Sequence, residues 1–308
     1  MGTEHAEPWT VLRLLQWTTD YFRKHGSTSP RLDAEVLLAE ARGSTRIDLY
    51  TAFGSEPSDE VREAFRELVR RRAEGTPVAY LVGHKEFYSI DLRVSEATLI
   101  PRPETEHLVV EVLDRAKEML AADPSRNQAA PNQAAPIRIA DIGTGCGAIP
   151  IAIAKNLPHC ALIATDISPA ALQIARYNVG RYHLEDRIEL REGDLLEPLA
   201  GEPPLEILCS NPPYISQEEY EQLAVDVRNF EPRQALVAGA KGTEVIERLL
   251  AQVPAKLVPG GCFIFELSPM IAADVVRMAN EFGTYQAPKL IKDLAGLPRI
   301  LSLATKMS

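Results

Sequence analysis

Apolar residues in the first third of the chain recur at the three- and four-residue spacing of amphipathic helices. One such segment runs from Val11 to Phe22, and a second begins at Pro30 and ends at Gly43. A third runs from Ser58, a suitable N-cap, to Ala73. Three or four short helices of this kind predict a small N-terminal bundle.

The pattern then changes to near-alternation of apolar and polar positions between Phe87 and Val94, which predicts a β-hairpin. A proline-bounded stretch at 99–106 leads into a helix predicted at about residues 105–120. Two tandem copies of Asn-Gln-Ala-Ala-Pro follow at 127–136, and we interpret this duplication as an exposed loop insertion without chemistry.

The remaining chain alternates strand and helix patterns, which predicts a parallel sheet with helices on both faces. The predicted strands are Ile137–Ile142, Ala161–Thr165, Ile188–Leu190, Leu205–Cys209, Cys262–Phe265 and Ile300–Ala304. The predicted helices are Ala148–Asn156, Pro169–Tyr177, 243–256 and 270–282. Ligands of such sheets bind at the carboxyl ends of the strands, near the point where the strand order reverses.

Composition narrows the class of protein. The 308 residues suggest about two domains at ~150 residues each. The net charge of −10 disfavours a protein whose main work is to hold a phosphate backbone. The four cysteines lie far apart along the chain and form no C-x-x-C pair, which disfavours both a disulfide framework and a zinc site. Residues 1–8 have no apolar core and no segment reaches 18 apolar residues, so we expect a cytoplasmic protein that makes no membrane contact.

The third predicted helix carries a row of arginines at four-residue spacing, Arg62, Arg66 and Arg70. One interpretation is a solvated face that is partly paired with the neighbouring glutamates. The other is a docking face for an acidic or nucleic-acid-bearing partner.

A glycine-rich turn follows the first predicted strand of the sheet and comprises Gly143, Thr144, Gly145, Cys146 and Gly147. Glycines let the chain turn tightly and let a ligand approach the backbone. The next helix begins at once, so its free N–H groups face the ligand. The spacing is G-x-G-x-G, whereas a dinucleotide fingerprint has G-x-G-x-x-G, which disfavours a nicotinamide-dependent oxidoreductase.

Acidic residues end the next two strands. Asp166 is placed to accept hydrogen bonds from ribose hydroxyls, and Asp194 from an adenine amino group, while Leu195 can pack on the adenine face. We also expect Asp141 to line this site, and the sequence has no nearby Lys or Arg before Lys155. Because its charges are negative, the site favours a cationic ligand. S-adenosylmethionine, with its sulfonium and amino groups, meets this requirement.

The fourth strand leads into Asn211-Pro212-Pro213-Tyr214, which suits a planar nitrogen acceptor. The Asn211 side-chain oxygen and the Pro212 carbonyl can each accept one N–H of an NH₂ group. Two prolines hold that carbonyl rigidly, and Tyr214 can stack on the planar face. The nitrogen then attacks the methyl carbon in line with the departing sulfur, and no metal is required.

This tetrapeptide resembles that of amino-directed methyltransferases, and two further stretches resemble the PrmC/HemK family: residues 75–83 and Leu99–Glu106. The resemblance implies a Rossmann-like class I methyltransferase sheet, mostly parallel with an antiparallel last strand, and a small N-terminal helical bundle. It implies a substrate-docking domain at 1–80, a β-hairpin linker at 81–104 and an S-adenosylmethionine-dependent domain at 105–308.

The same resemblance implies methylation of the side-chain nitrogen of glutamine in the Gly-Gly-Gln motif of bacterial class I peptide-chain release factors. By motif, Gly143–Gly147, Asp166 and Leu195 would contact the cofactor. Asn211 would contact cofactor and substrate, and the residues from Pro212 to Tyr214 would contact the substrate glutamine. The expected partner is the release factor, docked by the N-terminal bundle, with no direct nucleic-acid binding and a monomeric enzyme.

Other functions remain open at this point. A glutamine methyltransferase of a large-subunit ribosomal protein is expected to carry Pro-Arg-Ser-Pro where this chain has Pro101-Arg102-Pro103-Glu104. An adenine-N6 or guanine-N2 nucleic-acid methyltransferase is disfavoured by the net charge. A non-catalytic binding protein is disfavoured because the glycine turn and the Asn211 tetrapeptide are both intact.

Overall fold

The computed structural model describes residues 8–122 and 136–307, so nearly all of the duplicated segment at 127–136 lies outside the described residues. The chain forms two compact units. Residues up to Gly83, together with Val225–Phe230, make the N-terminal unit, and the rest of the chain makes the sheet unit. In the described part of the chain, no helix is both long and apolar enough to cross a membrane.

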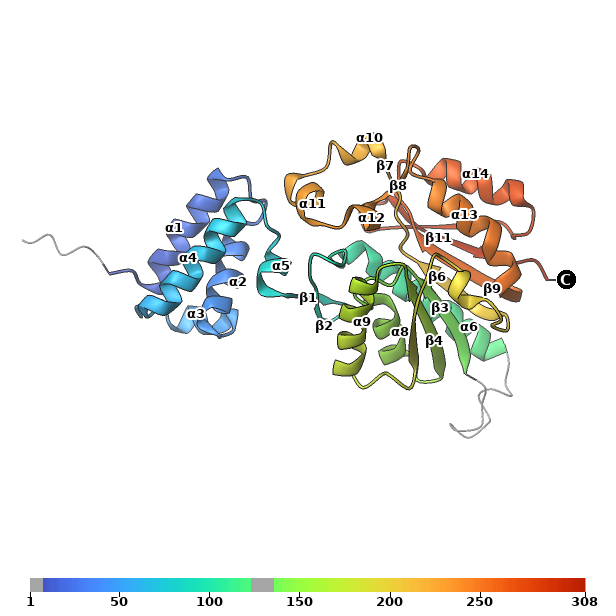
Figure 1. The fold of residues 1–308 in the computed structure, drawn as a ribbon, viewed down its shortest axis with the longest axis horizontal. Coiled ribbons are helices and arrows are strands. Elements are labelled where there is room, and N and C mark those ends of the chain that lie inside the picture. Colours follow the sequence, from blue (N-terminus) through green and yellow to red (C-terminus); the bar gives the residue numbers. More distant parts are fainter. Residues whose placement is uncertain (1–7, 123–135, 308) are drawn as a thin grey trace, which may run out of the picture. The chain divides into compact units, whose positions relative to one another are not determined.

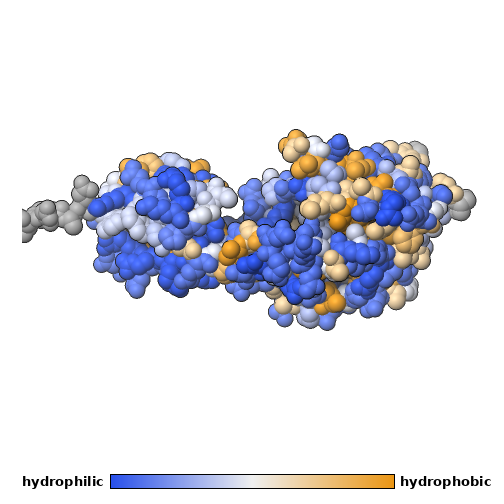
Figure 2. Space-filling model, turned by 90° about the horizontal axis from the view of Figure 1, so that it is seen from above, coloured by the Kyte–Doolittle hydropathy of each residue, from blue (hydrophilic) through white to orange (hydrophobic). Residues whose placement is uncertain are grey.

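The N-terminal unit is helical, as the spacing of its apolar residues predicts (Figure 1). Its helices are α1 (Val11–Lys24), α2 (Pro30–Arg42), α3 (Arg46–Thr51), α4 (Asp59–Ala73), α5 (Val78–Val82) and α11 (Val225–Phe230). The Ser58 side chain accepts from the Val61 N–H and caps α4, while Gly43 ends α2 at φ +59°. The face of this unit visible in Figure 2 is mostly hydrophilic.

The α11 helix belongs to this unit although it lies far along the chain. Its Phe230 and Val225 approach Gly75 so closely that a Cβ atom on Gly75 would meet them at 3.3 and 3.5 Å. Neither α11 nor the short α3 was predicted, because six residues are too few to show a helical period.

The sheet unit contains seven strands in the order β10-β11-β9-β6-β3-β4-β5 (Figure 1). Five are parallel, and β11 runs antiparallel between β9 and β10. The strands are β3 (Ile137–Ile142), β4 (Cys160–Asp166), β5 (Ile188–Glu192), β6 (Leu205–Ser210), β9 (Leu257–Glu266), β10 (Lys289–Lys292) and β11 (Pro298–Ala304). The predicted mostly parallel sheet with an antiparallel last strand is confirmed. The edge strand β10 was missed.

Helices cover both faces of the sheet. On one face α13 (Glu244–Gln252) and α14 (Ala272–Phe282) pack against Phe263, Phe265 and Leu301. Three more helices contact the strands: α6 (Glu106–Ala122), α8 (Ala148–Asn156) and α9 (Pro169–Arg181). Helix α6 contacts β6, β9 and β11, whereas α8 and α9 contact β4 and β5. Shorter elements are η1 (Pro103–Thr105), η2 (Glu197–Leu199), η3 (Val253–Lys256), β7 (Ile215–Ser216), α10 (Gln217–Tyr220), α12 (Arg233–Leu236) and β8 (Val237–Gly239).

The predicted hairpin is present as β1 (His84–Phe87) and β2 (Ile90–Arg93). Its two turn residues, Tyr88 and Ser89, both have positive φ, which is the backbone of a tight type I′ turn. The buried amide of Asn178 on α9 joins this hairpin to the glycine turn. It accepts from the Arg93 N–H at 2.8 Å and donates to the carbonyls of Arg93 and Cys146 at 2.9 and 2.8 Å.

Replacing Asn178 with Ala removes the partner of the half-buried Arg93 N–H and of the buried Cys146 carbonyl. We expect a loss of about 2–3 kcal/mol in the free energy of unfolding, measured by urea denaturation. The matched control is Asn280→Ala on the exposed side of α14, which should change stability by less than about 0.5 kcal/mol. Equal stability of the two variants would show that Asn178 does not brace the turn.

Candidate active site

The carboxyl ends of β3, β4, β5 and β6 surround a cavity of about 320 Å³ in the sheet unit. This is the place where the strand order reverses, with β4 and β5 on one side of β3 and β6 on the other. Most residues that the sequence assigned to cofactor or substrate line it: Gly143, Thr144, Gly145, Cys146, Asp166, Asp194, Leu195, Asn211 and Pro213. Gly147, Pro212 and Tyr214 are not among its lining residues.

The glycine turn folds back on the end of β4. The N–H groups of Gly143 and Thr144 both donate to the Thr165 carbonyl, at 2.9 and 2.8 Å. Gly143 and Gly145 have φ of +75° and +57°, and a Cβ on either would meet no atom within 4 Å. Gly147 also has a positive φ, +83°, and in addition a Cβ there would meet Ile151 of α8 at 3.3 Å.

Asp166 connects this turn to the start of α9. Its Oδ2 accepts from the Gly145 N–H at 2.8 Å and its Oδ1 from the Ser168 N–H at 2.9 Å. Burial raises the pKa of this carboxyl, and the backbone donors oppose that effect. The carboxylate therefore ties the glycine turn to the start of α9 and lines the cavity.

The wall that carries Asp194 and Leu195 differs from expectation in one respect. Arg248 on α13 lines the cavity and donates to Oδ2 of Asp194, so the expectation of no nearby cation is wrong. Arg248 was missed because it lies 54 residues further along the chain. Asp194 thus faces the cavity with its charge partly neutralised.

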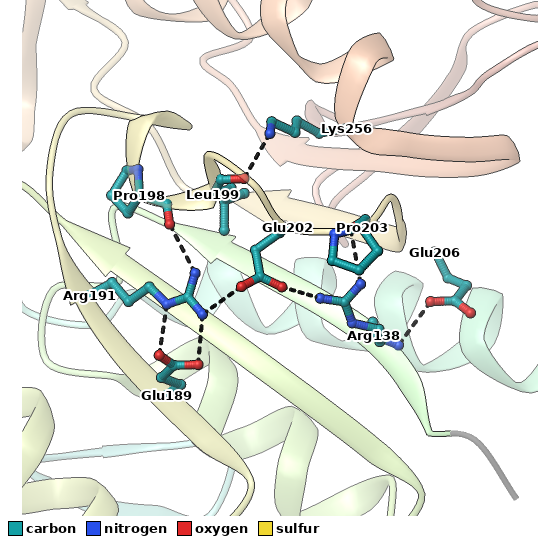
Figure 3. Close-up of polar contacts among 9 residues, drawn as sticks. All are labelled: Arg138, Glu189, Arg191, Pro198, Leu199, Glu202, Pro203, Glu206 and Lys256. Atoms are coloured by element: carbon teal, nitrogen blue, oxygen red, sulfur yellow. Dashed lines mark hydrogen bonds and ion pairs between the residues drawn. The ribbon is translucent and has the colours of Figure 1, made fainter.

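A polar network braces the same wall from outside (Figure 3). Arg191 donates to the Pro198 carbonyl at 2.9 Å, and Lys256 donates to the Leu199 carbonyl at 2.7 Å. Glu202 accepts from Arg191 at 2.8 Å and from Arg138 at 2.5 Å. These bonds connect β3 and β5 to the segment that follows Leu195.

Asp141, expected to line the site, is fully buried and is not a lining residue. Its Oδ2 and the Oγ1 of Thr144 have no hydrogen-bond partner among the described residues. Burial raises the pKa of Asp141 to about 7. A buried acidic group behind the cavity-lining glycine turn favours a ligand that carries positive charge, as S-adenosylmethionine does.

Asn211 stands at the end of β6, on the cavity wall. Its Nδ2 donates to Oγ1 of Thr105 at 3.2 Å. The stacking role expected of Tyr214 stays a prediction. Its side chain packs against the core beneath the sheet, and its hydroxyl donates to Glu266 at 3.0 Å. A buried phenol needs an acceptor, and Glu266 supplies it.

Sequence reasoning missed four residues around Asn211. Thr105 lines the cavity, and Glu266 ends β9 beneath it. Glu231, also buried, pairs with Arg102 and accepts from the Ile100 N–H at 3.2 Å. Two of these, Arg102 and Thr105, lie in a stretch that carried the family resemblance, but the long separations along the chain hid their contacts with Glu231 and Glu266. Among the described residues, no group of three or more potential ligands is placed to hold a metal ion.

Comparison with known proteins now decides the family. Residues 13–83 match the PrmC N-terminal domain model, and residues 111–230 match the methyltransferase small domain model. The chain is 54% identical over 301 residues to the release factor glutamine methyltransferase of Rhodopirellula baltica, covering 98% of both chains. The chain belongs to the release factor glutamine methyltransferase family.

Other relatives agree. The enzyme of the same name from Geobacter sulfurreducens is 37% identical, with 96% of this chain and 98% of that one covered. Among solved structures, the hMettl16 catalytic domain aligns with a TM-score of 0.54 at 16% identity, covering 78% of this chain and 82% of that one, which supports the fold alone. The protein is therefore an S-adenosylmethionine-dependent methyltransferase.

The buried Asp141 predicts a pH dependence of cofactor binding. Its folded pKa of about 7 lies above its ordinary value of 3.8, so this group lowers the stability of the cofactor-free protein as the pH rises from about 4 to about 7. A cationic ligand favours the charged carboxylate. We therefore expect S-adenosylmethionine to bind more tightly at pH 7.5 than at pH 6, with release of a proton.

Calorimetry in buffers of different ionisation enthalpy measures both the affinity for S-adenosylmethionine and the number of protons released on binding. Asp141→Asn should remove the proton release between these pH values, whereas Asp274→Asn, at an exposed position on α14, should keep it. Proton release that persists in the Asp141 variant would place its origin elsewhere.

Proposed function

We propose that this enzyme transfers the methyl group of S-adenosylmethionine to the side-chain amide nitrogen of glutamine in the Gly-Gly-Gln motif of class I peptide-chain release factors. The observation that carries the proposal is the position of Asn211. It lines the cavity at the carboxyl ends of the strands, and its side-chain NH₂ donates a hydrogen bond to Thr105. Relatives covering nearly the whole chain bear the name of this activity.

The cofactor would lie along the carboxyl ends of the strands. The glycine turn would hold its amino-acid end, Asp166 its ribose, and Asp194 the adenine amino group, beside Arg248. Leu195 would cover the adenine face. When bound, S-adenosylmethionine supplies a methyl group already activated by the sulfonium.

The protein's task is then to orient a weak nucleophile. The amide nitrogen has a delocalised lone pair, and hydrogen bonds that accept its two protons raise its electron density. Asn211 Oδ1 and the Pro212 carbonyl would accept them, and the rigid Pro212-Pro213 pair would keep the carbonyl in place. Alignment of nitrogen, methyl carbon and sulfur supplies much of the rate, and the product proton leaves to water afterwards.

Methyl-labelled S-adenosylmethionine and a purified release factor test the proposal directly, with the label mapped by mass spectrometry. Label on the Gly-Gly-Gln glutamine is the expected result. Label on a large-subunit ribosomal protein or on nucleic acid, with none on the release factor, would refute it.

Replacing Asn211 with Ala should lower kcat for release-factor methylation by about 10²–10³-fold, because an acceptor for the attacking amide is lost. Cofactor affinity, measured by calorimetry, should change by only a few-fold. Asn280→Ala serves as the control and should keep full activity. An Asn211 variant with normal kcat would show that the acceptor lies elsewhere.

The N-terminal unit offers a docking surface for the protein substrate. A groove of about 680 Å³ lies between α1 and α4. On its α1 side Trp17 stacks on Tyr21 at 5.0 Å, and Arg13 lies 4.6 Å from the Trp9 ring. Exposed aromatic side chains are common anchors of protein–protein contacts.

The arginine row of α4 forms the other side of this groove. Arg62 pairs with Asp59, and Arg70 pairs with Glu67 and Glu74, which favours the interpretation of a partly paired, solvated face for these two. No carboxylate of the described residues lies within ion-pairing distance of Arg66. We therefore propose that the groove binds a release-factor segment that carries an apolar side chain and a carboxylate.

The double variant Trp17→Ala with Arg66→Ala should raise KM for the release factor about tenfold, since loss of one anchor commonly costs over 1 kcal/mol. It should leave kcat and cofactor affinity unchanged, because neither residue belongs to the sheet unit. Steady-state kinetics at varied release-factor concentration measures the effect, with Arg277→Ala on α14 as control. An unchanged KM would exclude this groove as the docking surface.

A further inference from the structure

A continuous chain of hydrogen bonds runs from the substrate-facing amide into the protein core. Asn211 Nδ2 donates to Thr105 Oγ1 at 3.2 Å, and Thr105 Oγ1 donates to Glu266 Oε2 at 2.6 Å. The other carboxylate oxygen accepts from the Tyr214 hydroxyl at 3.0 Å. Thr105 and Glu266 are 4% and 2% exposed, so water does not compete for these bonds.

The direction of each bond follows from the groups involved. Both hydroxyls donate to Glu266, and each of its carboxylate oxygens accepts one of these bonds. Thr105 has one hydroxyl proton, which forms the hydrogen bond to Glu266. In any further hydrogen bond, Thr105 Oγ1 can therefore only accept. The group that Asn211 presents to Thr105 must then be its NH₂, because its carbonyl oxygen would meet a lone pair.

This direction determines which atom of Asn211 remains for the substrate. With Nδ2 turned to Thr105, Oδ1 is the atom left for a ligand in the cavity that Asn211 lines. A free asparagine amide can rotate and exchange its two ends. The opposite orientation would present NH₂ donors to an incoming NH₂ group and repel it.

We propose that Glu266, acting through Thr105, is a positioning residue that holds the Asn211 amide in the orientation that accepts the substrate N–H. The inference rests on the proposed function and extends it to a residue that does not line the cavity. Tyr214 occupies the second carboxylate oxygen and so keeps the Glu266 side chain turned toward Thr105.

Side chains of similar size test this chain of bonds. Thr105→Val removes the acceptor for Asn211, whereas Thr105→Ser keeps a hydroxyl in the same place. Glu266→Leu frees the Thr105 hydroxyl to donate toward Asn211. The matched control is Glu281→Leu, at an exposed position on α14.

Thr105→Val and Glu266→Leu should each lower kcat about 100-fold, a loss typical of a misplaced or missing contact to the reacting group. KM for the release factor and Kd for S-adenosylmethionine should stay within threefold. Thr105→Ser keeps the hydroxyl, so its kcat should stay within threefold of the wild-type value. The double variant Thr105→Val with Glu266→Leu should also lower kcat about 100-fold in total, because both changes break the same chain of bonds.

Several results would overturn the proposal. Normal kcat in Thr105→Val would show that Asn211 needs no such partner. A double variant that loses about 10⁴-fold would show two independent roles. A loss of kcat that comes with an equal loss of cofactor affinity and a lower Tm would indicate a merely structural carboxylate. A wild-type enzyme that leaves the release factor unlabelled would instead overturn the proposed function, and this inference with it.

Discussion

Burial of carboxylates at one edge of the parallel sheet is the constraint on which the site depends. Asp141 and Glu266, at the ends of β3 and β9, are buried, as is Glu231, and Asp166 at the end of β4 is half-buried. A buried charge is costly unless donors surround it. Most of the local geometry can be understood as the supply of those donors, from backbone N–H groups, hydroxyls and Arg102. Asp141 is the exception, since its Oδ2 has no partner among the described residues, and it lies beneath the turn where a cationic ligand would bind.

The donors differ in a way that separates the two halves of the site. Backbone N–H groups hold Asp166, so the cofactor side is shaped by the course of the chain itself. Side-chain hydroxyls hold Glu266, so the substrate side depends on rotamers and on the direction of each O–H bond. The first arrangement tolerates changes in side-chain identity better than the second. Single substitutions near Asn211 should therefore affect catalysis more sharply than those around Asp166, where we propose that the ribose binds.

Much of the fold was predictable because its signals are local. The strand β3 and the helix α8 have the predicted bounds, since the apolar run and the glycine turn between them are adjacent in sequence. The cavity-lining residues of the glycine turn, Asp166 and Asp194 could be found for the same reason, as each follows its own strand directly. The contacts of Arg248 with Asp194 and of Thr105 with Glu266 were not, because they span 54 and 161 residues. The hydrogen bond from Tyr214 to Glu266 was not predicted either, because the two residues lie 52 positions apart along the chain.

The helix α11 makes the N-terminal unit discontinuous along the chain. The polypeptide leaves the sheet unit after Ala224, contributes Val225–Phe230 to the N-terminal unit, and returns at Glu231, the partner of Arg102. Cleavage after Gly83 would therefore not excise an intact unit, because the side chains of α11 that pack near Gly75 would stay with the other fragment. The chain passes between the two units three times, at residues 83–84, 224–225 and 230–231. Recombination of modules between relatives would have to exchange both segments together.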